Sequence, residues 1–322
     1  MFTVLAGFKV VLPLLYLGTF ALYLWLFIGD DPTARRRCSQ LAVLTVLLHL
    51  VALVLKAFAL DRLPLGTPLE FFSALALALT GTYLVIEKRI KAKNTGWLVL
   101  GTAFLLQMFA STFCQTKLIT NKLLQDPGFG GHVILAILAY TALSLSFLYA
   151  VLYLVLARQL GRRQFGLLFR RLPSLEVLER MSIGAIKLAV PMLFLSLCLG
   201  HLWMYDLAER VSPDVASQLS PFDPKILITW FIFLGYALGL VGHRLLGWRG
   251  RRMNILAVVA FLVVLGTTGV IHHFFPTFHK FRSFEDAFGA MGRAAPAPTE
   301  IVHQDGRIQD GQLKDGQQGG GQ

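Results

Sequence analysis

The histidines are the residues of this chain whose type and placement could do chemistry. His132, His201, His272, His273 and His279 stand at the edges of long apolar stretches. Two neutral imidazoles from separate helices can bind an iron atom from the two faces of a porphyrin. Zinc would require a third or fourth ligand, and the sequence has no carboxylate at ligand spacing. The pattern favours haem iron over zinc, while each of these histidines taken alone can also be a plain residue of the membrane boundary.

Two further histidines lie inside or at the end of an apolar stretch. His49 is in the middle of one, where an ionisable side chain is costly and is a candidate for function. Lys56 follows two helical turns later on the same face and can reach the boundary or meet an acidic ligand group. The alternative role of His49 is a hydrogen bond to a neighbouring helix, and that of His243, beside arginines, is structural. Glu70 begins its stretch, where a carboxylate suits the helix dipole.

Other catalytic signatures are missing from the sequence. It contains no glycine-rich phosphate loop, no HExxH and no GxSxG. The three cysteines, Cys38, Cys114 and Cys198, have no CxxC spacing, so we expect isolated thiols that pack as small apolar side chains. No CxxCH occurs, and the chain is therefore not expected to carry a covalent c-type haem itself.

Long apolar stretches must position these histidines. Each is close to the ~20 residues that a helix needs to cross ~30 Å of hydrocarbon. They lack the alternation of barrel strands, so only helices can satisfy the backbone in lipid. The sequence predicts an all-α polytopic membrane protein with eight transmembrane helices. The stretches are residues 8–28, 39–60, 66–86, 95–113, 131–156, 183–204, 224–243 and 253–275.

The charges of the connecting loops alternate. Seventeen lysines and arginines fall in loops one, three, five and seven, and few fall in the others. Basic loops remain cytoplasmic, so both termini are predicted to lie outside. The net charge of +12 follows largely from this asymmetry, and no basic patch outside these loops points to a nucleic-acid partner. The basic loop residues are Arg35, Arg36, Arg37, Lys88, Arg89, Lys91, Lys93, Arg158, Arg162, Arg163, Arg170, Arg171, Arg180, Arg244, Arg249, Arg251 and Arg252.

The chain divides into a membrane domain over residues 1–285 and a polar tail over 286–322, predicted to be disordered and outside. The first apolar stretch lacks the features of a signal peptide and is expected to be retained. Residues 163–182 mix arginines with apolar side chains, which predicts an amphipathic helix on the inner membrane surface. Pro173 and Ser174 favour a helix start within this segment. Residues 205–223 are predicted to form an outer loop region.

Several segments together resemble the cytochrome c assembly family, the haem-handling membrane proteins of CcsA and ResC type with their HemX-like relatives. The resemblance spans about residues 8–282. It rests on HLVALVLKAF, on TPLEFFSALALALTGTYLVIEKR, on HVILAILAYTALSLSFLYAVLYLVL, and on RLPSLEVLERMSIGAIKLAVPMLFLSLCLG, the most specific match. GHLW with FDPKILITW is similar to the tryptophan-rich outer loop, and GWRGRRMNILAVVAFLVVLGTTGV with FPTFH is similar to the closing helix and second outer histidine.

This resemblance implies a site. Two outer histidines, matched by His132 and His279, would ligate the iron of a non-covalent haem b. A second pair, matched by His49 and His243, would lie within the membrane. Of the outer loop this chain retains Trp203, Asp223 and Trp230, with Phe222 expected in the cavity wall. The loop is otherwise degenerate, because Ser220, Pro221 and Phe222 stand where the family has tryptophans.

The leading hypothesis is a haem-binding and haem-translocating protein of c-type cytochrome maturation in the cell inner membrane. Its enzymatic role would be at most that of a component in a cytochrome c haem lyase (synthase) complex. Its partners would be haem, apocytochrome c and a second membrane subunit. The alternatives are a non-catalytic regulator or scaffold of the same fold without haem, and a transporter of another small molecule.

Overall fold

The computed structural model describes residues 2–90, 93–113, 125–211, 213–216 and 219–274, without the side chains of 2–3, 214–215 and 268–274. Within these ranges the chain is helical and contains no strand, in agreement with the predicted class. The helices are α1 (Phe2–Gly29), α2 (Pro32–Leu60), α3 (Pro68–Ile90), α4 (Gly96–Thr112), α5 (Pro127–Gly161), α6 (Leu167–Arg171), α7 (Leu175–Arg210), α8 (Pro213–Ala216), α9 (Pro224–Leu245) and α10 (Arg251–Phe274).

Six of the described helices are long and apolar enough to cross a membrane: α1, α2, α3, α5, α7 and α9. The chain is therefore a multi-pass membrane protein by helix length and composition. The other two expected spans correspond to α10 and to the shorter α4, whose 17 residues extend about 25 Å. The number of eight spans and the outward position of both termini stay predictions.

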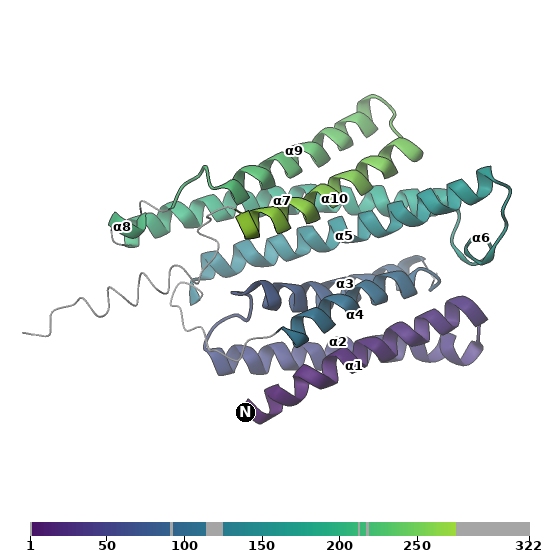
Figure 1. Ribbon diagram of the computed structural model, residues 1–322, viewed down its shortest axis with the longest axis horizontal. Helices are drawn as coiled ribbons and strands as arrows, with labels where there is room; N and C mark the ends of the chain where they lie inside the picture. Colours follow the sequence, from purple (N-terminus) through teal and green to yellow (C-terminus); the bar gives the residue numbers. More distant parts are fainter. Residues whose placement is uncertain (1, 91–92, 114–124, 212, 217–218, 275–322) are drawn as a thin grey trace, which may run out of the picture.

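Consecutive long helices run antiparallel (Figure 1). One end of the bundle, called the basic end here, holds the turn between α1 and α2, the turn between α9 and α10, and α6. The predicted basic loops fall at this end. The opposite end, called the histidine end, holds the start of α5 with His132 and the end of α7 with His201.

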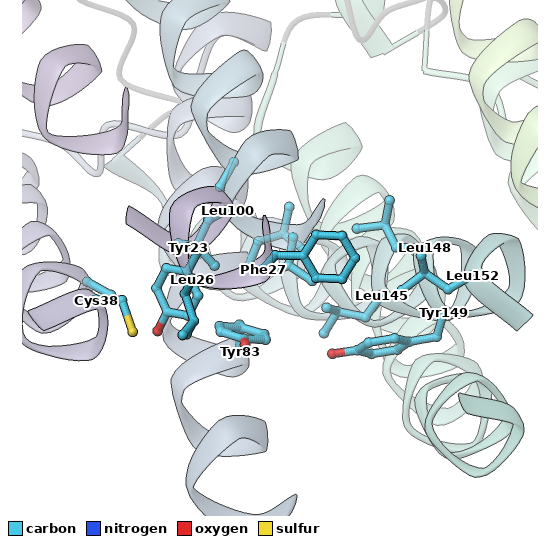
Figure 2. Close-up of a cluster of buried hydrophobic side chains, with 14 of the residues drawn as sticks. Tyr23, Leu26, Phe27, Cys38, Tyr83, Leu100, Leu145, Leu148, Tyr149 and Leu152 are labelled. Carbon is cyan, nitrogen blue, oxygen red and sulfur yellow. The ribbon is translucent and has the colours of Figure 1, made fainter. Parts of the chain in front are cut away.

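Helices α5 and α7 form the most extensive helix pair and lie at the centre of the bundle. On one side of them are α1 to α4, and on the other are α9 and α10 (Figure 1). Buried tyrosines connect the central pair with the first four helices (Figure 2). Tyr83 of α3 lies between Tyr23 of α1 and Tyr149 of α5, and the rings of Tyr23 and Tyr83 are 5.6 Å apart.

Three helices begin with the same Asp-Pro sequence. Asp31, Asp126 and Asp223 are the N-caps of α2, α5 and α9, and each is followed by a proline in the first turn. Their carboxylates accept hydrogen bonds from the backbone N–H groups of Ala34, Gly128 and Lys225. An aspartate at the N-cap satisfies an otherwise unpaired N–H, and proline is tolerated in the first turn because it has no N–H to lose.

The segment 163–182 differs from the single surface helix expected there. It contains the five-residue α6 and the first eight residues of α7, which continues without interruption to Arg210. The predicted helix start at Pro173 and Ser174 is confirmed, because Ser174 is the N-cap of α7 and its hydroxyl accepts from the Val177 N–H at 3.5 Å. The expected outer loop 205–223 begins with the last turns of α7 and includes α8.

Candidate functional site

His132 lies in the second turn of α5 and is anchored to α7. Its Nδ1 donates to the backbone carbonyl of Ser196 at 2.8 Å. The Ser196 hydroxyl also donates to the His132 carbonyl at 3.1 Å. Because a carbonyl oxygen can only accept, Nδ1 carries the proton and the lone pair of a neutral ring is at Nε2. Histidines that bind metals through Nε2 commonly have this Nδ1–H to carbonyl bond, which fixes the tautomer and the ring orientation.

Glycines bring α5 and α7 close enough for this contact. A Cβ at Gly200 would lie 2.7 Å from the His132 Nδ1, so the imidazole rests directly on the backbone of α7. In the reverse direction, a Cβ at Gly128 would lie 2.8 Å from Cδ1 of Trp203. Each helix therefore supplies a glycine on which a ring of the other helix is seated.

An ion pair holds the start of α5 to the end of α7. The Arg210 guanidinium lies 2.8 Å from the Asp126 carboxylate and also contacts Asp206. Burial acts to raise the pKa of Asp126, but hydrogen bonds from Arg210 and from the Gly128 N–H hold that pKa below its ordinary value. Asp126 thus caps α5 and connects it to α7. The second connection between these helices, from His132 to Ser196, lies about two turns further along α5.

His201, one residue after Gly200, faces α9. Its Nδ1 donates to the Leu197 carbonyl at 2.8 Å, and its ring centroid is 6.0 Å from that of Trp230. Lys225 lies in the first turn of α9 and Trp230 in its second turn, at the same end of the bundle as the start of α5. The structure therefore gathers His132, His201, Trp230 and Lys225 at the histidine end, from three helices.

The other residues expected in the cavity wall lie elsewhere. Trp203 is only 7% exposed and packs against Phe129, 5.5 Å away, in the apolar cluster between α3, α5 and α7. Phe222 is 76% exposed in the turn before α9. Asp223 is buried as the N-cap of α9, a positioning role for Lys225 and Trp230 in the same helix. Trp203, Phe222 and Trp230 have different surroundings, and their assignment to one cavity wall stays a prediction.

His279 lies outside the described residues, so its assignment as second iron ligand stays a prediction. His272 and His273 fall within the last turn of α10, at the same end of the bundle as the start of α5. Their side chains are outside the described ones. The described part of the site therefore offers one expected iron ligand, His132.

His49 is fully buried, and both of its ring nitrogens are engaged. Ser73 donates to Oε1 of Gln107 at 2.8 Å, so its oxygen accepts from Nε2–H of His49 at 3.1 Å. The Tyr16 hydroxyl then donates to Nδ1 at 2.9 Å. Gln107 continues the chain by donating to Ser111 at 3.0 Å. His49 connects α1, α2 and α3 in this arrangement, which is the structural role weighed above.

Lys56 pairs with a protein carboxylate in the structure. Its Nζ is 2.9 Å from Glu70, which is 6% exposed and also lies 3.0 Å from Arg62. The Glu70 carboxylate further accepts from the N–H groups of Gly66 and Thr67. Glu70 thus organises the connection between α2 and α3, beyond its favourable place in the helix dipole.

His243 lies in the last turn of α9 and is hydrogen-bonded to the turn that follows it. Its Nδ1 donates to the Trp248 carbonyl at 2.7 Å, and the Trp248 N–H donates to the Gly242 carbonyl at 3.1 Å. α2 and α9 lie on opposite sides of the α5–α7 pair (Figure 1). His49 and His243 therefore do not meet in one site.

Comparison with known proteins identifies the family. The model of the family described as "Cytochrome C assembly protein" matches residues 65–270, which is more than half of the chain. The chain belongs to this family. The matched region includes α3 to α9 and all of the described residues that surround His132.

Three relatives illustrate the range of this cytochrome c assembly family. Inner membrane protein YpjD of Escherichia coli (strain K12) is 28% identical over 217 residues, covering 65% of this chain and 78% of that protein. Protein HemX of Bacillus subtilis (strain 168) is 32% identical over 143 residues, covering 44% and 51%. Cytochrome c biogenesis protein CcsA of Pyropia yezoensis is 26% identical over 276 residues, covering 70% and 82%.

Sequence reasoning did not find Ser196 and Gly200, the residues that seat His132 in this family member. A signal was present, because small residues four apart on a membrane helix mark a face where another helix can approach closely. The sequence placed His201 at the correct end of the bundle but gave it no role distinct from the other histidines predicted there. Its contact with Trp230 depends on which side of α7 faces α9, which hydropathy does not reveal.

Proposed function

We propose that this protein binds haem b at the histidine end and acts in the maturation of c-type cytochromes. The observation that carries this proposal is the fixed tautomer of His132. Its Nδ1–H is held by the Ser196 carbonyl, and the Nε2 lone pair is left as an iron ligand. Membership in the cytochrome c assembly family supports the same conclusion.

The surrounding residues suit a porphyrin. The half-buried Trp230 can pack on the macrocycle, because an indole supplies a large flat apolar surface. Lys225 is an exposed cation at the start of the same helix and can pair with a haem propionate. Bound haem would supply the iron and the porphyrin that is transferred, while this chain holds the ring and orients the ligand. His279 is the proposed second ligand.

Transport of haem across the membrane is a further part of the proposal. An inner haem site at His49 requires its ring to leave the Tyr16 hydroxyl or Ser73, since both nitrogens are engaged. His243 would then act separately, at the basic end. We further propose that the protein lies in the cell inner membrane with its basic end cytoplasmic, and that apocytochrome c and a second membrane subunit are its partners in a haem lyase (synthase) complex.

The test is the absorbance of the purified full-length protein, alone and titrated with haem. We expect a Soret band of bis-histidine type that is lost or shifted in His132→Ala and in His279→Ala. His303→Ala, a change in the predicted tail, is the matched control and should leave the spectrum as in the parent. A variant with His272, His273 and His279 all replaced excludes substitution among neighbouring histidines.

Two outcomes would reject the proposal. If His132→Ala retains the haem content and spectrum of the parent, His132 is not a ligand. If the parent protein binds no haem while remaining folded, the scaffold function is favoured. His49 supports this second function, because both of its ring nitrogens already hydrogen-bond to side chains of the protein. In that state its role is to hold α1, α2 and α3 together and not to bind iron.

A further inference from the structure

A hollow opens on the side of the bundle between α2 and α3 at the basic end. Its volume is about 590 Å³, and its walls include Val43 of α2 with Leu84 and Val85 of α3. Val43 and Val85 are 45% and 55% exposed, so the opening faces outward from the bundle, where membrane lipid lies. We call this hollow the α2–α3 groove.

The groove has polar groups at its basic end. Lys93 lies there, donating from Nζ to the Ser39 hydroxyl at 2.6 Å and to the Arg35 carbonyl at 2.8 Å. The same Nζ is 3.6 Å from the carboxylate of Glu87, which also accepts hydrogen bonds from Tyr23 and Ser39. Figure 2 shows Tyr23 beside Cys38 in the buried core. The charge of Glu87 is therefore matched by Lys93.

Lys88 supplies the excess charge of the groove. It lines the hollow, is exposed, and has no ion-pair partner among the described residues. A second hollow of about 600 Å³ lies at the first turns of α2 and is lined by residues that include Arg36 and Arg37. The groove itself therefore combines apolar walls with the exposed Lys88 cation at its polar end.

We propose that the α2–α3 groove binds an acidic glycerophospholipid. The phosphate lies at Lys88, and an acyl chain extends along Val43, Leu84 and Val85. An anionic headgroup suits the net positive charge, since each basic residue at a membrane surface contributes about 1 kcal/mol of attraction to anionic lipid. A zwitterionic lipid would place its ammonium near the Lys88 ammonium. This site lies at the opposite end of the bundle from His132.

The experiment uses full-length protein in detergent, stripped of lipid and examined by native mass spectrometry. Phosphatidylglycerol, phosphatidylethanolamine and glycerol 3-phosphate are added in separate titrations. We expect phosphatidylglycerol to remain bound at concentrations at which the other two do not. Equal retention of phosphatidylethanolamine would overturn the preference for an acidic lipid. Equal binding of glycerol 3-phosphate would show a phosphate site without a lipid chain.

Matched variants locate the site. Lys88→Glu should weaken phosphatidylglycerol binding about tenfold or more, whereas Arg89→Glu changes the net charge equally next to the groove and should have a much smaller effect. Val85→Trp should fill the groove and displace the lipid, and Val54→Trp, an exposed position elsewhere on α2, should not. Thermal unfolding confirms that all four variants are folded. Equal losses within either pair would refute the site.

Discussion

Replacing Gly200 by alanine tests whether the seat of His132 on α7 is as tight as the structure indicates. The new Cβ would lie 2.7 Å from Nδ1 and 2.8 Å from Cε1 of His132, closer than such atoms approach without displacement. The imidazole must move away, which lengthens its 2.8 Å hydrogen bond to the Ser196 carbonyl. Overpacking costs about 1–3 kcal/mol, and a lost hydrogen bond costs about 0.5–1.5 kcal/mol.

Alanine also stabilises a helix relative to glycine by about 1 kcal/mol, which offsets part of this cost. We therefore expect Gly200→Ala to lower the free energy of unfolding by about 1–3 kcal/mol. Gly184→Ala is the control on the same helix, because a Cβ there would meet no atom within 4 Å. It should leave stability unchanged or raise it by up to about 1 kcal/mol.

The assay is reversible unfolding in mixed detergent, followed by circular dichroism, together with a haem titration. If haem binds through His132, a displaced ring should weaken binding about tenfold for each 1.4 kcal/mol of lost ligation. Equal unfolding free energies for the Gly200 and Gly184 variants would refute the packing argument. Reduced stability with unchanged haem affinity would keep the packing argument but reject His132 as the ligand.

Three further predictions concern the remaining polar contacts. Hydrogen bonds from Arg35 and Arg171 hold the pKa of Asp30 below its ordinary value, so the stability that this contact contributes is present at neutral pH and is lost as pH falls through the lowered pKa. The protection of the α6 amides, taken relative to their intrinsic exchange rates, should therefore fall in acid, and Asp30→Asn should show this loss already at neutral pH. His49→Phe should cost about 1–3 kcal/mol in detergent unfolding, because it leaves a buried hydroxyl without its partner. Glu70→Gln should cost about 3 kcal/mol, since it removes the carboxylate charge beside the buried Arg62 guanidinium, and Glu176→Gln, in an exposed pair, should cost under about 0.5 kcal/mol.

Each of these predictions has an outcome that contradicts it. Protection of the α6 amides that does not change in acid would mean that Asp30 does not hold that segment. Unchanged stability of His49→Phe would mean that the Tyr16 hydroxyl finds another partner. Equal effects of the two glutamine variants would mean that the burial of Glu70 has no energetic consequence.

Each apolar stretch predicted from hydropathy corresponds to one long helix and differs from it by at most two residues beyond a helix end, because hydropathy depends only on the residues of one segment. The Asp-Pro starts of α2, α5 and α9 and the start of α7 at Ser174 are likewise local signals. The partners across helices were not predictable in this way. Lys56 was expected to reach the membrane boundary or to meet an acidic group of a ligand, and it pairs with Glu70 instead.

The candidate site shows the same difference between local signals, which were predictable, and contacts between helices, which were not. His132 and His201 were placed at one end of the bundle by chain direction alone. Trp203 was grouped with Trp230 because both follow from the same motif, but it points toward α3 and α5 while Trp230 contacts His201. Which side of a helix faces which neighbour is decided by close packing, here by Gly128 and Gly200, and not by apolar content.

The paired glycine seats of α5 and α7 restrict how this protein can move. If one helix slid along the other, the His132 ring would have to leave Gly200 and the Trp203 ring would have to leave Gly128 at the same time. Each ring would then collide with the side chains that flank its glycine. These two helices therefore behave as one rigid body. Any change of shape that admits or releases a ligand must occur at the borders of that body, where α9 and α10 lie on one side and α1 to α4 on the other.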